Sequence, residues 1–327
     1  MEYRQFGKTD MKISELSFGT WAIGGAWGKT NDQEALNGLA RAMEAGVNFF
    51  DTADVYGDGH SEELLAKATK GKEDKIYIAT KFCRAGDIHD PENYSEESVT
   101  NYVDNSLRRL KREQLDLLQI HCPPIEILRD GSVFEVLDKL QQKGKIRHYG
   151  VSVETVEEGL LSMENPNVAA LQVIFNIFRQ KPMMELFPVA KKKKVGILAR
   201  VPLASGLLTG KFQSNHQFEA DDHRHFNQNG EAFNVGETFA GLPFHKGVEL
   251  SRQLEWIADR RGNMTRAALK WILSHDAVTS VIPGFKTVQQ VEDNLAAMNV
   301  PEFSESELEK LREFYQLEVH DSIRGPY

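Results

Sequence analysis

Short apolar runs alternate with amphipathic stretches along most of the chain. Their length and composition are typical of buried strands, and they lie at residues 16–23, 47–51, 75–81, 115–121, 146–153, 168–176, 195–202 and 279–282. Apolar residues at helical spacing predict helices over residues 32–45, 61–69, 95–109, 132–143, 155–163, 183–193, 244–261, 265–275, 288–298 and 304–315. Ser61 and Thr265 are interpreted as N-caps.

Strands that alternate with helices imply a parallel sheet. Eight such units favour a closed (β/α)8 TIM barrel over an open doubly wound sheet. Residues 18–25 are rich in glycine but only loosely approximate the turn of a dinucleotide-binding sheet, so we interpret those glycines as loop residues. Residues 3–13 predict an N-terminal β-hairpin that plugs the barrel floor. The whole chain, residues 1–327, is expected to form a single domain.

A long stretch without clear periodicity, residues 206–245, follows the seventh predicted strand. Loops of this length in compact domains are usually lids, binding loops or disordered. Because barrel active sites lie at the strand end where this stretch begins, we interpret it as a lid, with a mobile surface excursion as the alternative. His223, Arg224 and His225 are expected to be exposed on it.

Composition narrows the classes of protein. A chain of 327 residues with 41% hydrophobic content can build one large core, and a net charge of −9 disfavours non-specific binding to nucleic acid or anionic membranes. The N-terminus has no signal-peptide pattern, and no apolar run reaches the ~18 residues of a membrane span. The two cysteines, Cys83 and Cys122, cannot form a multi-bridge framework and are interpreted as apolar filler. We therefore expect a cytoplasmic protein.

Polar residues end three consecutive predicted strands: Asp51, Lys81 and His121. Because strands in a sheet lie about 4.8 Å apart, side chains at matched heights can converge inside the barrel mouth. Tyr56 lies on the loop over the same mouth. A buried lysine without a partner is costly, so Lys81 should pair with Asp51.

These four residue types suit proton transfer to a carbonyl. A phenol has a pKa of about 10, and an adjacent ammonium lowers it. Tyr56 could then donate a proton to a carbonyl oxygen as hydride arrives. Asp51 would anchor Lys81, and His121 would orient or polarise the same oxygen. Each residue alone is more typical of a cap, a core position or a structural hydrogen bond; the set in register favours catalysis.

The segment Asp51-Thr52-Ala53-Asp54-Val55-Tyr56-Gly57, with the contexts of Lys81 and His121, resembles the signature of the aldo-keto reductases. The resemblance runs from Phe6 to Leu295 and is greatest to the bacterial branch of general stress and inositol-related reductases. It implies a (β/α)8 barrel that uses NADPH, less often NADH. It also implies that Tyr56, Asp51, Lys81 and His121 form the catalytic tetrad.

The same resemblance implies cofactor contacts. Gly19, Thr20, Trp21 and Asp51 would lie near the nicotinamide, whose carboxamide would meet Ser152 and Gln172. Arg200 stands where the family usually has a stacking aromatic residue, so it either lies flat on the ring or pairs elsewhere. The pyrophosphate-binding loop would contain Pro202, Leu203, Ser205, Gly206, Leu207 and Lys211.

A second anion site is predicted where Gly284 precedes a helix. The resemblance implies that Lys286 and Thr287 hold the adenosine 2′-phosphate and that Asp293 and Asn294 meet adenine. Gln290 replaces an arginine of many relatives, which keeps NADH open beside NADPH.

Two other functions stay open at this point. One is a cofactor-binding regulatory module with weak catalysis, as in potassium-channel β subunits. The other is a metal-dependent barrel hydrolase, which a lysine beside Asp51 disfavours. The expected partner is a small carbonyl compound. The sequence leaves its identity open, along with the choice between monomer and homo-oligomer and the role of Trp27 and residues 84–94 as pocket walls.

Overall fold

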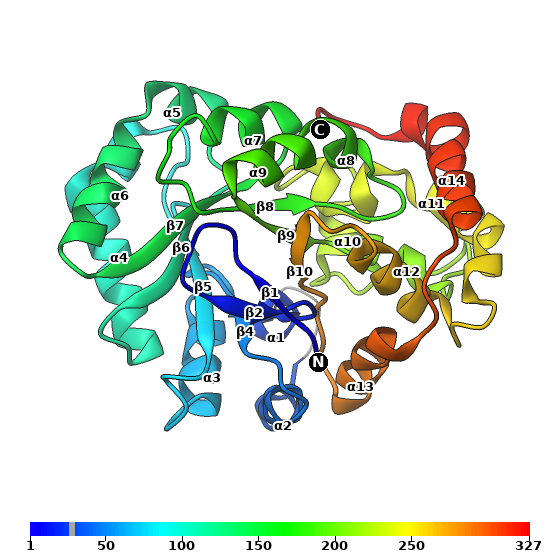
Figure 1. The fold of residues 1–327 in the computed structure, drawn as a ribbon, viewed down its shortest axis with the longest axis horizontal. Helices are drawn as coiled ribbons and strands as arrows, with labels where there is room; N and C mark the ends of the chain where they lie inside the picture. The colour runs from blue at the N-terminus through cyan, green and yellow to red at the C-terminus, as the bar shows by residue number, and fades with distance from the viewer. Residues whose placement is uncertain (26–29) are drawn as a thin grey trace.

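The computed structural model describes residues 1–25 and 30–327; Trp27 therefore lies outside the described residues. Eight parallel strands pair in chain order: β3 (Phe18–Gly19), β4 (Phe49–Asp51), β5 (Tyr77–Phe82), β6 (Leu115–His121), β7 (Ile146–Val153), β8 (Ala170–Ile174), β9 (Gly196–Arg200) and β10 (Val278–Val281). Parallel bridges Leu16–Val281 and Gly19–Gly284 bring the last strand back to the first. The predicted (β/α)8 TIM barrel is confirmed (Figure 1).

Helices surround the strands (Figure 1). Their bounds are α1 (Trp21–Gly24), α2 (Asp32–Glu44), α3 (His60–Ala68), α4 (Glu96–Leu110), α5 (Ile125–Asp130), α6 (Ser132–Gln142), α7 (Val156–Ser162), α8 (Lys181–Glu185), α9 (Phe187–Lys193), α10 (His223–Phe226), α11 (Phe244–Gln253), α12 (Met264–Leu273), α13 (Val288–Leu295) and α14 (Glu305–Phe314). Among the described residues, no helix is long and apolar enough to cross a bilayer.

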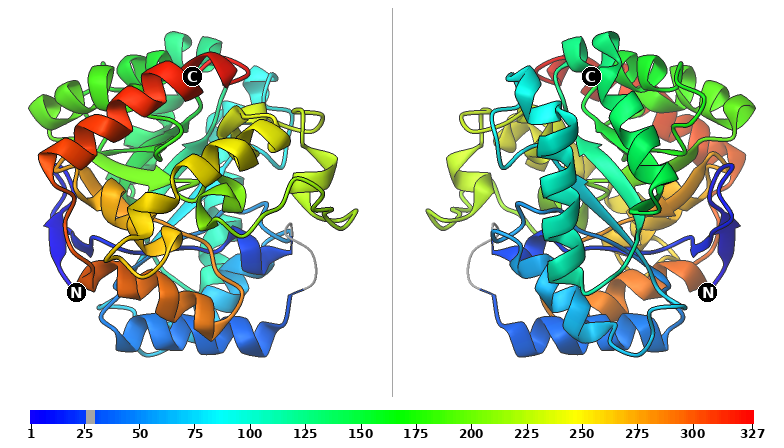
Figure 2. Two further views of the ribbon diagram at one scale, coloured as in Figure 1. Left: turned by 90° about the vertical axis from the view of Figure 1, so that its right-hand side faces the viewer. Right: turned by 90° about the vertical axis from the view of Figure 1, so that its left-hand side faces the viewer.

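The N-terminal hairpin closes one end of the barrel. Strands β1 (Tyr3–Gln5) and β2 (Lys12–Ser14) pair antiparallel, as predicted. Hairpin residues Phe6, Met11 and Ile13 are fully buried in one cluster with the inward-facing strand residues Phe49, Ala79, Leu117, Ala170 and Leu198. Figure 2 places the hairpin and the yellow-green segment around residues 215–240 at opposite ends of the barrel. The floor is therefore apolar and filled.

Several predicted bounds are wrong for local reasons. The strand predicted over 16–23 ends at Gly19, and Trp21–Gly24 forms helix α1. A Cβ on Gly24 would lie 2.9 Å from the backbone of Tyr56, so the chain turns here in close contact with the next loop. The helix predicted over 183–193 is two helices, α8 and α9, and Pro188 lies in the first turn of α9, where proline is favoured. The helix predicted over 244–261 ends at Gln253 and continues as a 3-10 turn.

The two predicted N-caps, Ser61 and Thr265, are also wrong. Helix α3 has Gly59 rather than Ser61 at its N-cap, whereas Ser95 caps α4. The Ser61 hydroxyl instead donates to the hydroxyl oxygen of Thr20, at 2.6 Å. Asn263, not Thr265, caps α12, because its side-chain oxygen accepts from the backbone N–H of Arg266, three residues later. Ser61 does not cap α3 because its hydroxyl is bonded to the buried Thr20 side chain instead.

The long segment after β9 is structured. It contains α10 and short 3-10 turns, and an aromatic cluster joins it to α11. Arg324, near the C-terminal end, donates to the carbonyl oxygens of Gln228, Gly241 and Leu242 at 3.0–3.1 Å. The expectation that residues 223–225 are all exposed is wrong, since His223 is fully buried. These contacts favour a docked cover over a loose excursion.

Candidate active site

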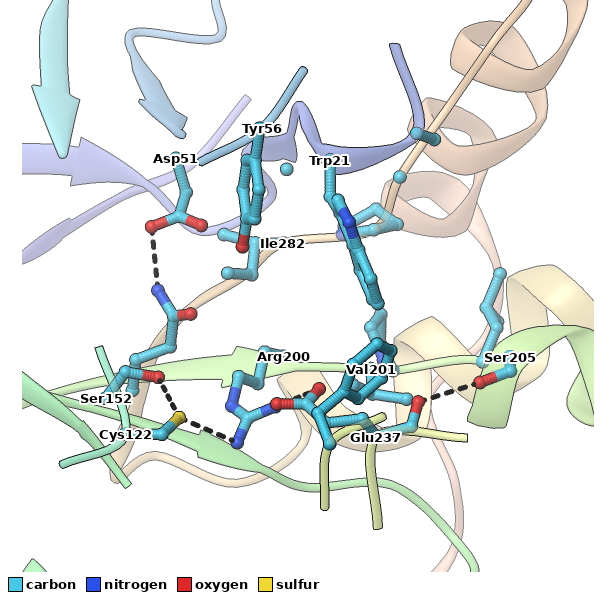
Figure 3. A pocket seen from close by; sticks show the side chains of 18 of the residues that line it. Trp21, Asp51, Tyr56, Cys122, Ser152, Arg200, Val201, Ser205, Glu237 and Ile282 are labelled. Carbon is cyan, nitrogen blue, oxygen red and sulfur yellow. Dashed lines mark hydrogen bonds and ion pairs between the residues drawn. The ribbon is translucent and has the colours of Figure 1, made fainter. Parts of the chain in front are cut away.

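A pocket of about 940 Å³ opens at the C-terminal ends of the strands, opposite the hairpin. Its walls include the ends of β4, β6, β7, β8 and β9, the segment after β9, and the start of α13. Figure 3 shows Tyr56 and Trp21 on one side of this pocket and Arg200 and Glu237 on the other. Tyr56 and Trp21 have ring centroids 6.0 Å apart and nearly parallel planes.

Asp51 and Lys81 form a buried ion pair beneath the pocket. The Lys81 ammonium donates to Asp51 Oδ1 at 2.6 Å and to the Thr52 carbonyl at 2.8 Å. Lys81 is fully buried and Asp51 is 3% exposed. Burial lowers the pKa of Lys81, but its charge interactions and hydrogen bonds with Asp51 and Tyr56 together outweigh burial, so the net pKa is raised. The lysine is therefore held in its charged form.

The expectation that Asp51, Lys81 and His121 stand at matched strand heights is wrong in detail. Asp51 is in register with Ala79, whereas Lys81 is in register with Gln119. The long lysine side chain makes up the difference. Two glutamines, on β6 and β8, also reach the Asp51 carboxylate: Gln119 and Gln172 donate to Asp51 Oδ2 at 3.1 and 2.7 Å. The carboxylate is thus fixed from three sides.

Tyr56 completes a chain from carboxylate to phenol. Its hydroxyl oxygen lies 3.3 Å from Lys81 Nζ, and the ring lines the pocket. Burial raises the pKa of Tyr56 above its ordinary value, and the neighbouring ammonium only partly offsets this. The predicted lowering of the Tyr56 pKa by Lys81 is present, but the effect of burial is larger. Tyr56 is held in place by Gly24 and Gly57, since a Cβ on Gly57 would lie 2.1 Å from the Gly24 carbonyl oxygen.

His121 stands across from the phenol. The two ring centroids are 5.8 Å apart, with planes at 82°. Burial, with the charges of Arg84 and Lys81, lowers the pKa of His121 well below its ordinary value. The imidazole is therefore neutral at neutral pH and can hydrogen-bond an oxygen without adding charge. The structure thus brings Asp51, Lys81, Tyr56 and His121 together at one pocket.

Most of the predicted cofactor residues line the same pocket: Gly19, Trp21, Asp51, Ser152, Gln172, Arg200, Pro202, Leu203, Ser205, Gly206, Lys211, Gly284, Lys286, Gln290, Asp293 and Asn294. Three do not line it: Thr20, Leu207 and Thr287. Thr20 is buried and donates to the Asp51 carbonyl, while Thr287 caps α13 by accepting from the Gln290 N–H.

The turn after β9 has an unusual backbone. Ala204, Ser205 and Gly206 take positive φ values of 47°, 53° and 100° in succession. Turns with residues in left-handed conformations can point several N–H groups toward one concavity, a common anion-binding arrangement. Lys211 also lines the pocket beside this turn. The geometry suits a pyrophosphate.

Basic groups gather at the far end of the pocket, near α13. Lys286 lies there, and burial lowers its pKa. The charge of Asp222 raises that pKa, and the charge of Arg224 lowers it. Arg224, from the segment after β9, lines the pocket and ion-pairs with Asp222 at 2.5 Å. Gln290 accepts from the Lys286 N–H at 2.6 Å. Arg224 therefore places a guanidinium at this end of the pocket, where the Gln290 side chain carries no charge.

Sequence reasoning missed two buried carboxylates at the pocket, Glu154 and Glu237. Both ion-pair with Arg200, and Glu154 also pairs with Arg84 at 3.2 Å. Their carboxylates and the Cys122 thiol are close enough together to resemble a metal site, but the Arg200 guanidinium contacts all three. Glu154 directly follows the Ser152 motif and could have been suspected. Glu237 carried no signal, because its segment has no periodicity.

Asp54, in the loop between Asp51 and Tyr56, yields a pH-dependent prediction. It is 6% exposed and forms no ion pair with any described residue. Burial, reinforced by Glu62, raises its pKa to about 7. An acid whose pKa is raised on folding lowers stability as pH climbs from its unfolded pKa toward its folded one. Asp54→Asn should therefore stabilise the fold at pH 8, by up to about 4 kcal/mol, and have little effect at pH 4.

Urea unfolding at pH 4 and pH 8 measures this difference. Asp58→Asn, at an exposed neighbouring position, is the control and should show no such pH dependence. Equal or lower stability of Asp54→Asn at pH 8 would refute the assignment.

Comparison with known proteins adds to this geometry. Residues 15–316 match the model of the Aldo/keto reductase family. The chain is 31% identical over 299 residues to the aldo-keto reductase YhdN of Bacillus subtilis (strain 168), covering 89% of this chain and 87% of that protein. It is 28% identical over 335 residues to a probable voltage-gated potassium channel subunit beta of Arabidopsis thaliana, with 97% of both covered.

Among solved structures, the fold is similar to that of the glycerol dehydrogenase AKR11B4 from Gluconobacter oxydans. The TM-score is 0.78 at 30% identity, covering 99% of this chain and 98% of that one.

Proposed function

The chain belongs to the aldo/keto reductase family and is an oxidoreductase, and on that basis we propose that it reduces an aldehyde or ketone to an alcohol with NADPH, with NADH as the alternative cofactor. The finer placement, in the bacterial branch of general stress and inositol-related reductases, rests on sequence resemblance. The physiological carbonyl compound is a small molecule that fits beside Tyr56 and His121.

The pocket fits a dinucleotide. Its two ends differ in chemistry, with Tyr56 and His121 at one and Arg224 and Lys286 at the other. The positive-φ turn near Ser205 lines the same pocket. The neutral, hydrogen-bonding end suits a nicotinamide carboxamide, which Ser152 would contact. The basic end suits phosphates, and Lys286 would hold the 2′-phosphate that distinguishes NADPH from NADH.

When bound, the reduced cofactor supplies a hydride to the carbonyl carbon. The chain's own residues handle the proton. Tyr56 donates its phenolic proton to the carbonyl oxygen, and the nearby Lys81 ammonium stabilises the phenolate that remains. Asp51 keeps Lys81 charged and in place. The neutral His121 ring hydrogen-bonds the same oxygen and orients it.

One observation carries the proposal: the continuous contact from Asp51 through Lys81 to Tyr56, 2.6 and 3.3 Å long, at the wall of a pocket. The test is to follow NADPH absorbance with purified protein and a panel of activated aldehydes, ketones and quinones. We expect turnover, unchanged by EDTA. Absence of turnover across the panel despite tight NADPH binding would instead favour the regulatory-module function, which the similarity to a channel subunit supports.

Lys286→Met serves as the matched cofactor control. It should raise the KM for NADPH and leave that for NADH nearly unchanged, because only NADPH carries the 2′-phosphate. Equal effects on both would remove Lys286 from the proposed phosphate site.

A further inference from the structure

A buried cluster of charges joins the barrel to the segment after β9. The Arg200 guanidinium contacts Glu237 Oε2 at 2.5 Å, Glu154 Oε2 at 3.2 Å and the Val153 carbonyl at 3.0 Å. Arg200, Glu154 and Glu237 are 7, 8 and 6% exposed. Figure 3 shows Glu237 reaching Arg200 from its own segment. The interaction is thus shielded from bulk solvent and its electrostatic effects are strong.

Glu237 is held by more than its ion pair. Its carbonyl accepts from the Ser205 hydroxyl at 3.1 Å, and the same hydroxyl oxygen accepts from the Phe239 N–H at 3.0 Å. Asn234 caps the short turn that contains it. These contacts fix the backbone independently of the carboxylate, so the charge can be removed without releasing the segment.

The formal charges around Arg200 balance. Three arginines and three glutamates act on one another there: Arg84, Arg179, Arg200, Glu154, Glu158 and Glu237. The Asp51–Lys81 pair also cancels. His121 is neutral, and burial raises the pKa of the Cys122 thiol, which keeps it neutral as well. Removing one glutamate charge therefore leaves one positive charge in excess.

Arg200 acts at the reacting end of the pocket. Its charge lowers the pKa of His121, and it interacts electrostatically with Tyr56. Proton donor and hydride donor must approach the same carbonyl group, so the nicotinamide belongs near these residues. This step rests on the proposed function. The oxidised nicotinamide is cationic and the reduced one is neutral, so an excess positive charge here disfavours only the oxidised form.

We propose that Glu237 is a positioning residue which neutralises Arg200 and thereby sets the relative affinity of the enzyme for oxidised and reduced nicotinamide cofactor. It allows a guanidinium to stand beside a cofactor that becomes cationic in each turnover. The segment after β9 thus contributes charge as well as cover.

The test compares Glu237→Gln with wild type by measuring Kd for NADP⁺ and for NADPH at pH 8, by calorimetry and cofactor fluorescence. Burial and the neighbouring Glu154 carboxylate raise the pKa of Glu237 on balance, although Arg200 lowers it, so the measurement is made at pH 8 to favour the ionised carboxylate. We expect the ratio of Kd for NADP⁺ to Kd for NADPH to rise about tenfold. A tenfold change corresponds to about 30 mV in the potential of the bound two-electron couple.

Three variants control the result. Glu237→Asp should restore the wild-type ratio, and the double variant Arg200→Gln/Glu237→Gln should return close to it, because both keep the charges balanced. Glu231→Gln removes an exposed charge from the same segment and should leave the ratio unchanged. Equal weakening of both cofactor forms in Glu237→Gln would overturn the proposal and leave Glu237 as a structural anchor. Failure of wild type to bind either form would overturn the proposed function instead.

Discussion

Tyr56→Phe should reduce the rate of carbonyl reduction by about 10²–10⁴-fold or more, the range typical of losing a general acid. The substitution removes one oxygen, which contacts Lys81 at 3.3 Å, and leaves the ring that stacks near Trp21. NADPH affinity should change little, because the phenol acts on the carbonyl compound. Steady-state kinetics and a direct cofactor titration on the same preparation separate the two effects.

Tyr3→Phe is the matched control. It deletes the same atom at the opposite end of the barrel, where the Tyr3 hydroxyl donates to the Gly46 carbonyl. Its activity should equal that of wild type. If Tyr56→Phe retained wild-type rates, the proton-donor assignment would be wrong whatever its effect on stability.

Lys81→Met is expected to cost both activity and stability. It would leave the Asp51 carboxylate, 3% exposed, without its cationic partner, and breaking a buried pair in this way costs about 3–5 kcal/mol. Activity should fall because the phenolate would lose its stabilising ammonium. Urea unfolding and turnover measured together on the variant test both losses.

The double variant Lys81→Met/Asp51→Asn separates structure from chemistry. With both charges gone, much of the stability should return, whereas activity should stay low. Lys139→Met, which breaks an exposed pair with Glu96, should cost at most about 1 kcal/mol. Recovery of activity in the double variant would contradict a direct role for Lys81.

The barrel could be predicted because its determinants are local. Strands β6 and β7 begin and end at the predicted residues, 115–121 and 146–153, since both are bounded by clear turns. Cap and bound errors arose where a distant partner competes, as Thr20 does for the Ser61 hydroxyl. Sequence spacing cannot reveal such competition.

The residues of the candidate site could be predicted more completely than their arrangement in space. Strand alternation put Asp51 and Lys81 on inward faces, but the register between strands, which offsets them, depends on the whole barrel. One of the two glutamate partners of Arg200, Glu237, could not be foreseen. Glu237 lies 37 positions away in an aperiodic segment, so only the fold reveals the contact.

The crossing of Gly24 and Gly57 limits how this protein can be redesigned. A methyl group at either position would meet backbone and displace the phenol-bearing loop. A mutational library aimed at new substrates would therefore lose function at these two glycines, however well the fold survived. Diversity is better directed at walls such as Ile88 and Phe233, which face the pocket from separate segments.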